Sequence, residues 1–192
     1  MKTQIFIIGC GGHSKVVTEV LVAMQKWDIV GYIDEHPKSG VFLGQPVFNS
    51  LAALSAKFPS VKSAFVAIGD NGKRKLWYKN LESSNHSIPW IAHPTAYVSP
   101  TATVGAGSLI GAKSSIGPYS AIGCGVIINT GAIIDHDCEV GNFSHIGQGA
   151  ITCGGVHVGS EVLVGPGCVL EKMTQIPDSK SLQSNFSIKP IQ

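Results

Sequence analysis

Residues 98–176 repeat with a period of six, without an insertion or a deletion. One position of each hexad, which we call the leader, is aliphatic in every repeat except the one led by Thr152. Glycine follows the leader in eight hexads, and a small residue stands four places after most leaders. A short, unbroken period of this kind is typical of stacked coils, not of a layered globular core. The leaders are Val98, Val104, Ile110, Ile116, Ile122, Ile128, Ile134, Val140, Ile146, Thr152, Val158, Val164, Leu170 and Ile176.

Within a hexad we expect the leader and the residue four places later to face inward, and the residue five places later to face outward. We expect the small residue after the leader to permit the turn to the next face. Three hexads make one triangular coil, so the fourteen hexads predict between four and five coils. Such a prism has flat faces with little side-chain bulk, and small repeat domains usually need partners, so we expect a symmetric homotrimer.

Residues 1–90 do not show this period. Apolar runs predict strands over 2–8, 29–34 and 64–68, and helical patterns cover 16–24, 51–58 and 73–82. Strands that alternate with helices predict a small parallel α/β sheet, here of three or four strands. Residues 89–100 are interpreted as the connector to the first coil. The predicted domains are therefore 1–90 and 91–192.

The composition excludes several classes of protein. A net charge of +2 is too weak to indicate binding to nucleic acid or to an anionic membrane, and the short basic run at 73–75 is interpreted as a solvated helix start. No apolar stretch approaches the ~20 residues needed to span a bilayer. The five cysteines lack the spacing of a zinc site, and Cys138 and Cys168 fall at the inward phase, where packing is their expected role. We expect a reduced, cytoplasmic protein.

Two segments narrow the interpretation further. Residues 9–17 read GCGGHSKVV, and residues 129–146 read NTGAIIDHDCEVGNFSHI. Together with the hexads, they resemble the hexapeptide-repeat nucleotide-sugar acetyltransferases of bacterial glycan biosynthesis, the family of the bacillosamine, viosamine and perosamine N-acetyltransferases and of the sialic acid O-acetyltransferases. The resemblance implies a small N-terminal Rossmann-like parallel α/β domain that binds a nucleotide sugar. It also implies a left-handed parallel β-helix that binds acetyl-CoA, although parallel crossovers are generally right-handed.

His136 is the leading candidate for a catalytic residue. It stands two places after leader Ile134, on the turn side of the coil, so its phase excludes it from the core. Asp135 and Asp137 flank it and can orient the ring and raise its basicity. The resemblance implies that His136 is the general base for the sugar amine and that Asp137 assists it, at a position where the family more often has Glu. The alternative is a surface histidine in a turn.

His145 occupies an outward strand position nine residues, or half a coil, after His136. The two histidines are therefore expected on different faces of one chain, which fits a site at a subunit interface. The resemblance implies that His145, Asn129 and Gly154 contact acetyl-CoA, whereas a lone histidine at this phase is more often a solvated strand residue. His136, His145 and His157 lack the separation near 18 that would stack metal ligands on one face, so no metal is expected.

The N-terminal glycine loop follows a predicted strand and precedes a helix, where backbone N–H groups can bind phosphate. Its pattern lacks the third glycine of a dinucleotide fingerprint, and Asp34 follows at a spacing that suits a ribose hydroxyl. The alternative for His13 is a helix N-terminal residue without a ligand. The resemblance implies that His13 lies near the sugar amine and that the nucleotide sugar contacts these residues: Gly11, Gly12, His13, Asp34, Glu35, Gly69 and Asn71.

The C-terminal tail departs from the family. Residues 176–179 match the usual exit from the last coil, but the tail at 185–191 keeps only Lys189 and Pro190 of the usual loop along coenzyme A. We expect the acetyl-transfer centre to be intact and the contacts with the distal parts of coenzyme A to be altered.

The expected reaction is direct transfer of an acetyl group from acetyl-CoA to the amine of a nucleotide-linked 4-amino-4,6-dideoxy sugar, without an acyl-enzyme. One alternative keeps the class of enzyme but changes the acceptor to a hydroxyl of a sialic-acid-like sugar. Another is a non-catalytic trimeric nucleotide-binding scaffold, which has no need of the acid–histidine cluster at 135–137. A small NAD-dependent oxidoreductase is disfavoured, because the α/β part is short and the glycine pattern is incomplete.

Overall fold

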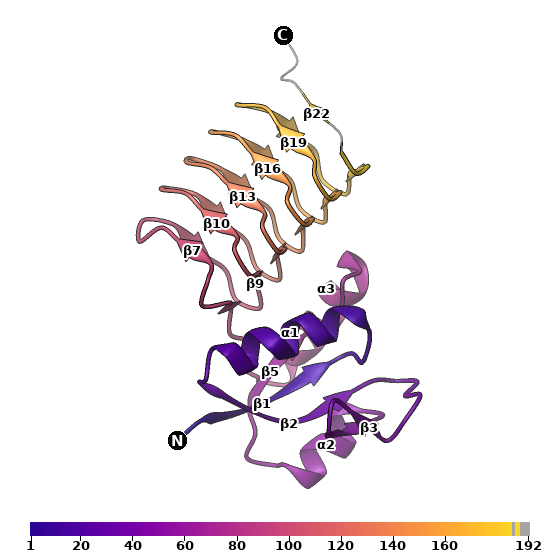
Figure 1. Cartoon of the computed structure of the whole chain (residues 1–192). Helices are drawn as coiled ribbons and strands as arrows, with labels where there is room; N and C mark the ends of the chain where they lie inside the picture. Colours follow the sequence, from indigo (N-terminus) through magenta and orange to yellow (C-terminus); the bar gives the residue numbers. More distant parts are fainter. Residues whose placement is uncertain (186, 189–192) are drawn as a thin grey trace. The chain divides into compact units, whose positions relative to one another are not determined.

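The computed structural model describes residues 1–185, 187 and 188, which form two compact units, Met1–Pro89 and Trp90–Gln192 (Figure 1). Unit 1 contains three helices and a five-stranded sheet in the order β3-β4-β2-β1-β5. Its elements are β1 (Thr3–Ile8), α1 (Gly12–Ala23), β2 (Trp27–Ile33), β3 (Val41–Phe42), β4 (Gln45–Phe48), α2 (Leu51–Lys57), β5 (Ser63–Val66) and α3 (Asn71–Ser83).

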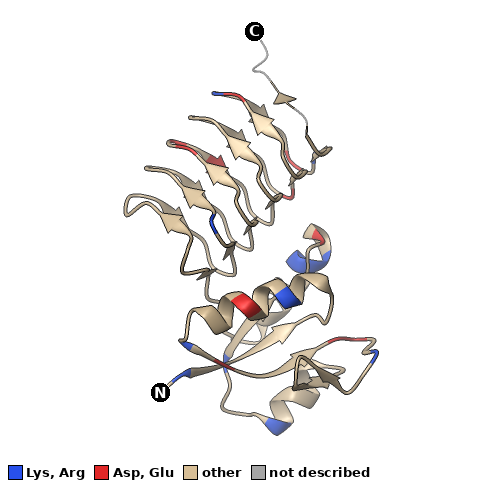
Figure 2. Ribbon diagram, viewed as in Figure 1, with Lys and Arg blue, Asp and Glu red and all other residues tan. Residues whose placement is uncertain are grey.

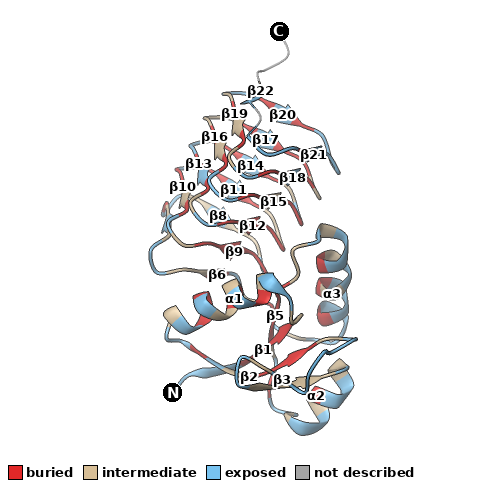
Figure 3. Ribbon diagram, turned by 45° about the vertical axis from the view of Figure 1, so that its right-hand side comes forward, coloured by how far each residue is buried: buried red, intermediate tan, exposed pale blue. Residues whose placement is uncertain are grey.

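Strand β1, which pairs with β2 and β5, is apolar and buried from Ile5 to Ile8, the pattern of a parallel strand that is covered on both faces (Figure 3). The parallel α/β prediction is confirmed, but the strand count is not, because the antiparallel β3–β4 hairpin was missed. Leu43 and Gly44 connect its strands and both have positive φ, of 47° and 78°. A hairpin turn of this kind usually carries Asn-Gly or Asp-Gly, so Leu43 hid the signal.

Unit 2 is a left-handed parallel β-helix built of two-residue strands in three sheets (Figure 1). We name each sheet after its first strand. The β6 sheet contains β6 (Ile91–Ala92), β9 (Leu109–Ile110), β12 (Ile127–Ile128), β15 (His145–Ile146), β18 (Leu163–Val164) and β21 (Ser181–Leu182). The β7 sheet contains β7 (Tyr97–Val98), β10 (Ser115–Ile116), β13 (Ile133–Ile134), β16 (Ile151–Thr152), β19 (Val169–Leu170) and β22 (Ser187–Ile188). The β8 sheet contains β8 (Thr103–Val104), β11 (Ala121–Ile122), β14 (Glu139–Val140), β17 (His157–Val158) and β20 (Gln175–Ile176).

Each strand pairs with the strand 18 residues further along, as Ile134 pairs with Thr152, so three hexads do make one coil. The leaders and the residues four places after them line the interior, where Cys138 and Cys168 are both fully buried. Charged side chains lie in the turns, and Glu139 is the one charged residue in a strand of the described β-helix (Figure 2). The hexad phase therefore predicted correctly which side chains face inward.

The physical reason for the glycines differs from the expected one. The turn is made at the residue three places after each leader. In every hexad from the one with Gly107 to the one with Asn185, the residue at this position has positive φ. Glycine directly after the leader is needed because the next coil passes close to it: a Cβ on Gly117 would lie 2.8 Å from the backbone of Asp135 and His136. Asp137 is one of the turn residues, with a φ of 56°, which Asp tolerates better than most residues.

The prism is longer at both ends than the sequence pattern predicted. Strand β6 precedes the first expected leader, Val98 in β7, and β21 and β22 continue past the expected exit at 176–179. The leader phase continues at Ala92, Leu182 and Ile188. The C-terminal extension was hidden because Lys180, four places after leader Ile176, stands where a small residue is usual. Most of the tail, with Lys189 and Pro190, lies outside the described residues. No helix in the described part of the chain has the length and apolar character to cross a membrane.

Candidate active site

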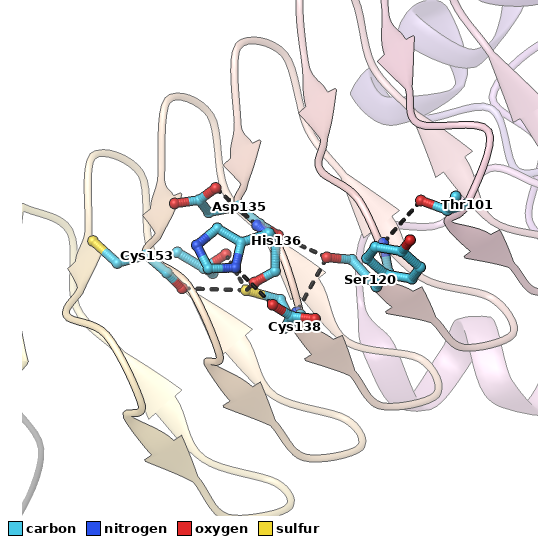
Figure 4. A network of polar contacts seen from close by, with 9 residues as sticks. Thr101, Ser120, Asp135, His136, Cys138 and Cys153 are labelled. Carbon is cyan, nitrogen blue, oxygen red and sulfur yellow. Dashed lines mark hydrogen bonds and ion pairs between the residues drawn. The ribbon is translucent and has the colours of Figure 1, made fainter.

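His136 lies in the turn between β13 and β14, at the corner that joins the β7 and β8 sheets. Its side chain is 57% exposed, and its Nδ1 is 2.7 Å from Oδ2 of Asp137. The backbone N–H of His136 donates to Oδ1 of Asp135 at 2.8 Å (Figure 4). Both flanking acids thus contact His136, one through the ring and the other through the backbone.

These contacts raise the pKa of His136 above its ordinary value, first through the hydrogen bond from Nδ1 to Asp137 and then through the negative charge of Asp135. An ionised carboxylate only accepts hydrogen bonds, so Nδ1 carries a proton in the neutral ring as well as in the charged one. The lone pair of the neutral imidazole is therefore on Nε2. This is the atom that can accept a proton from a bound substrate.

Gly154 lies against the imidazole of His136, one coil further along. A Cβ at this position would be 2.6 Å from both Nε2 and Cε1, so only glycine leaves room for the ring. The cavity beside them has a volume of about 430 Å³, and it is lined by Asp135, His136, Asp137, Cys153, Gly154, Gly155, Lys172 and Met173. Nε2 thus borders a space that is open to a small acyl group.

Asn129 and His145 form a second cluster, on the β6 sheet and at its turn toward the β7 sheet. Oδ1 of Asn129 accepts the backbone N–H of Thr130 at 2.8 Å, which directs Nδ2 toward His145 Nε2 at 3.0 Å. Nε2 of His145 consequently accepts this hydrogen bond. The structure therefore divides the three residues expected to bind the cofactor, because Gly154 lies with His136 at another corner.

His157 pairs with Glu139 on the β8 sheet, with Nδ1 2.9 Å from Oε2. It is the second exposed histidine of unit 2 that is paired with an acid. Among the described residues, no group of three His, Cys, Asp or Glu side chains is placed to hold a metal ion.

Unit 1 contains a cavity of about 1010 Å³ at the carboxyl ends of β1, β2 and β5. Six of the seven residues expected at the nucleotide sugar line it: Gly11, Gly12, His13, Asp34, Glu35 and Gly69. Oδ2 of Asp34 accepts the backbone N–H of Cys10 at 3.1 Å and Oδ1 accepts that of His36 at 3.0 Å, so this carboxylate joins two of the loops. Burial, and then Asp34, raise the pKa of the Cys10 thiol to about 11, so it is protonated at neutral pH.

Asn71 does not line the cavity; its Oδ1 accepts from Nη2 of Arg74 at 2.7 Å. Arg74 was missed, and the interpretation of its basic run as solvated is wrong for this residue, which is 1% exposed. Its Nη1 donates to the carbonyls of Ile68 and Gly69 at 3.1 and 3.0 Å and so fixes the loop after β5. Burial lowers the pKa of Arg74 to about 10, against the opposing effect of Asp70.

Helix α3 also contributes a wall of the cavity that sequence reasoning did not identify. Most of its members recur at helical spacing, and the wall consists of Lys73, Leu76, Trp77, Lys79, Asn80 and Ser83. Four large apolar residues of this helix are consecutive or nearly so, and Tyr78 and Leu81 are buried in the core, whereas Leu76 is 70% exposed beside Trp77. An exposed leucine beside a tryptophan in such a helix indicates a binding surface.

Residues 4–81 match the PglD N-terminal domain family. The whole chain is similar to perosamine N-acetyltransferase from Caulobacter crescentus, solved with CoA and GDP-perosamine, at 33% identity and a TM-score of 0.93; the match covers 97% of this chain and 89% of that one. The acetyltransferase domain of PglB from Neisseria gonorrhoeae FA1090, solved with acetyl coenzyme A, is 30% identical with a TM-score of 0.77, and the match covers 100% of both chains.

WeeI from Acinetobacter baumannii AYE shares the fold at 20% identity and a TM-score of 0.74, over 96% of both chains. The matches at 30% and 33% identity extend over nearly the full length of both chains, through the glycine loop of unit 1 and the acid–histidine turn of unit 2. This chain therefore belongs to the family of acetyl-CoA-dependent nucleotide-sugar N-acetyltransferases built on a left-handed β-helix.

Proposed function

We propose that this protein transfers the acetyl group of acetyl-CoA to the amine of a nucleotide-linked 4-amino-4,6-dideoxy sugar. The observation that carries the proposal is the His136 turn, where an acid-paired imidazole directs Nε2 to a cavity kept open by Gly154. The similarity to an enzyme solved with CoA and GDP-perosamine supports the choice of an amino sugar.

In the proposed mechanism His136 is the general base. A protonated amine has no lone pair, so the sugar amine attacks the thioester carbon in its neutral form. As the C–N bond forms, Nε2 takes a proton from the nitrogen; the C–S bond then breaks, and the imidazolium returns the proton to the coenzyme A sulfur. Asp137 keeps Nδ1–H oriented and stabilises the transient imidazolium, as an acid does for other catalytic histidines. No enzyme nucleophile is needed.

We propose that acetyl-CoA contacts Gly154 of one subunit and Asn129 and His145 of a neighbouring subunit in a homotrimer. The arrangement within one prism supports this, because His136 lies at the corner between the β7 and β8 sheets, whereas His145 lies on the third sheet. A triangular prism places a corner and the opposite face on different sides. Only another copy of the chain can bring an Asn129–His145 cluster to the His136 turn.

We propose that the cavity of unit 1 binds the nucleotide sugar. Its volume of about 1010 Å³ accommodates a nucleoside diphosphate sugar, and Gly11 and Gly12 begin α1, where unpaired N–H groups favour phosphate. Asp34 and Glu35 are the proposed partners of the ribose hydroxyls, and His13 of the sugar. Asn71 acts indirectly, through its hydrogen bond with Arg74.

The test is a thiol-release assay with acetyl-CoA and a panel of UDP-, dTDP- and GDP-linked 4-amino-6-deoxy sugars, with His136→Ala as the control. Turnover of one amino sugar that is lost in the variant supports N-acetylation and identifies the nucleotide. Turnover of a sialic-acid-like hydroxyl acceptor alone would replace the amine by a hydroxyl. No turnover, together with no binding of coenzyme A, would contradict the enzymatic proposal and favour a scaffold.

The shared site is tested separately by mixing inactive His136→Ala and His145→Ala subunits. Random exchange in a trimer restores an intact site at about a quarter of the interfaces, so we expect about a quarter of the wild-type activity. A mixture that stays inactive after verified subunit exchange would place both histidines in the same subunit's site.

A further inference from the structure

Thr152 is the one polar leader in the hexad run, and the proposed reaction gives it no role. It lies in β16, directly after Ile134 in the stack of the β7 sheet, and its side chain is buried at 1% exposure. Its Oγ1 is 3.4 Å from Sγ of Cys138. A hydroxyl in an aliphatic core is normally retained for a hydrogen bond, and here its partner is a thiol under the His136 turn.

Cys138 is fully buried, and its sulfur lies between two backbone segments (Figure 4). Sγ is 3.2 Å from the carbonyl of Cys153 and 3.6 Å from the carbonyl of His136. Carbonyl oxygens only accept hydrogen bonds, so the thiol donates its one proton to the nearer carbonyl, that of Cys153. Its sulfur then accepts a hydrogen bond from the hydroxyl of Thr152. The pair therefore links the turn that carries His136 to the turn that carries Gly154, the residue against which the imidazole lies.

Ser120, from the preceding coil, holds the same turn from its other side (Figure 4). Its Oγ donates to the carbonyl of Asp135 at 2.6 Å and accepts the backbone N–H of Cys138 at 3.1 Å. We call this arrangement, in which one serine hydroxyl joins both ends of a turn, a serine bridge. It connects the two residues that enclose His136 and Asp137.

Two other turns of the β-helix have a serine bridge. Ser108 joins the carbonyl of Gly123 to the N–H of Val126, and Ser144 joins the carbonyl of Gly159 to the N–H of Val162. The positions that correspond to Cys138 and Thr152 are apolar in both turns: Val126 with Val140, and Val162 with Ile176. The serine bridge is thus a general feature of this prism, whereas the thiol–hydroxyl pair occurs at the His136 turn.

We infer that Cys138 and Thr152 are positioning residues that fix the His136 turn relative to the Gly154 turn, so that Nε2 points into the cavity between them. His136 needs such a device because its side chain is more than half exposed and has little packing of its own. Gly154 leaves only the space of the ring, so a small displacement between the coils changes where Nε2 points. This inference rests on the proposed role of His136 as the base.

The experiment exchanges the core pairs of two serine-bridged turns. Cys138→Val with Thr152→Val gives the His136 turn an apolar pair, and Thr152→Val alone removes only the hydroxyl. We expect a melting temperature equal to or above that of the wild type, because a buried polar pair is replaced by apolar groups. We also expect kcat to fall about tenfold with both KM values unchanged, because the base is misdirected while the substrates still bind.

Two matched variants complete the design. Thr152→Ser retains the hydroxyl and should restore most of kcat. Val126→Cys with Val140→Thr builds the same pair at the turn of the Ser108 bridge and should leave kcat unchanged. A loss of kcat by this control as large as that by the double valine variant would overturn the inference, as would a kcat within twofold of the wild type in Thr152→Val.

An NMR pH titration of His136, in protein with labelled histidine and assigned with His136→Gln, gives a readout that does not depend on turnover. We expect Thr152→Val to shift the ring resonances and change the apparent pKa, and Thr152→Ser to leave both near the wild-type values. Unchanged resonances in Thr152→Val would overturn the positioning role. A wild-type protein that acetylates no sugar would contradict the proposed function alone, and the titration would still decide whether this pair positions the ring.

Discussion

The two units of this protein place their functional residues in different ways. In unit 2 one period fixes the direction of nearly every side chain, so the His136 turn, its acids and Gly154 come from the same corner of successive coils. In unit 1 the cavity collects loops from three strands and a face of α3, and the loop after β5 is held by the buried Arg74. The repeat places a side chain by its phase, whereas the α/β unit places it by tertiary contacts.

This difference has a consequence for robustness. A change in the β-helix acts on a local neighbourhood of two or three coils, because each repeat contacts only its neighbours. A change in unit 1 can move two loops together, because the carboxylate of Asp34 accepts the backbone N–H of Cys10, 24 residues earlier in the chain, and that of His36 in its own loop. Substitutions in the two units should therefore separate chemistry from binding.

The largest effect is expected for His136→Ala, compared with His157→Ala. Both histidines are exposed on the same prism and have Nδ1 within 2.9 Å of a carboxylate, but only His136 borders Gly154 and its cavity. Removal of a general base typically costs 10²–10⁴-fold in rate, so we expect kcat/KM to fall by about this factor in His136→Ala. His157→Ala should retain kcat/KM within about threefold of the wild type. An equal loss of kcat/KM in the two variants would mean that the position beside Gly154 does not distinguish the catalytic histidine.

The next effect tests whether the space at Gly154 serves the imidazole. Gly154→Ala should lower kcat about 10–100-fold, because its Cβ occupies the place of the ring at 2.6 Å and displaces Nε2. Gly149→Ala is the control: its Cβ meets nothing within 4 Å, but its φ of 63° strains an alanine by about 1 kcal/mol. We therefore expect Gly149→Ala to have a lower melting temperature but the kcat of the wild type, whereas Gly154→Ala loses kcat. A fully active Gly154→Ala would show that the imidazole of His136 can take another position in which it still acts.

How much could be predicted from the sequence follows the same division. The coil, the inward phase, the solvent side of His136 and the pairing of Asp137 were all accessible, because a period of six leaves few alternatives for a side chain. The bridge from Cys138 to Thr152 was not, since it joins residues of adjacent coils through atoms whose spacing the period does not specify. Thr152 was visible as an exception to the pattern, but its partner was not.

In unit 1 the strands and helices were accessible, but Arg74 was read as a solvated cation because it stands between two lysines. Its burial depends on three acceptors at the end of β5 and the start of α3, which come together only when the strand and the helix pack. The β3–β4 hairpin was hidden for a local reason, the leucine at a turn position with positive φ.

Arg74→Met tests the claim that one buried side chain supports the cavity of unit 1. Three acceptors lose their donor, so we expect the free energy of unfolding to decrease by on the order of 3 kcal/mol. We also expect the KM for the nucleotide sugar to rise about tenfold, with the KM for acetyl-CoA unchanged, because the loop at Gly69 lines the first cavity and not the second. Lys57→Met, at an exposed position of α2, controls for loss of charge. Equal changes in both KM values would mean that the substitution disturbs the whole protein.

The smallest effect is a shift of the pH profile. The base must be neutral, and Asp137 and Asp135 raise the pKa of His136, so the acid limb of kcat/KM should lie at higher pH than an unperturbed histidine would give. Asp137→Asn removes the larger cause and should move this limb toward lower pH. The amide oxygen of the substituted side chain can still accept the proton of Nδ1, so maximal kcat should fall only about three- to tenfold.

Asp135→Asn should move the acid limb in the same direction by less, because Asp135 acts on the ring through charge and bonds only to the backbone N–H. The same sugar is used throughout, so the titration of its own amine contributes equally to every profile, and the difference between profiles belongs to the enzyme. An acid limb that stays in place in Asp137→Asn would mean that a group other than His136 accepts the proton.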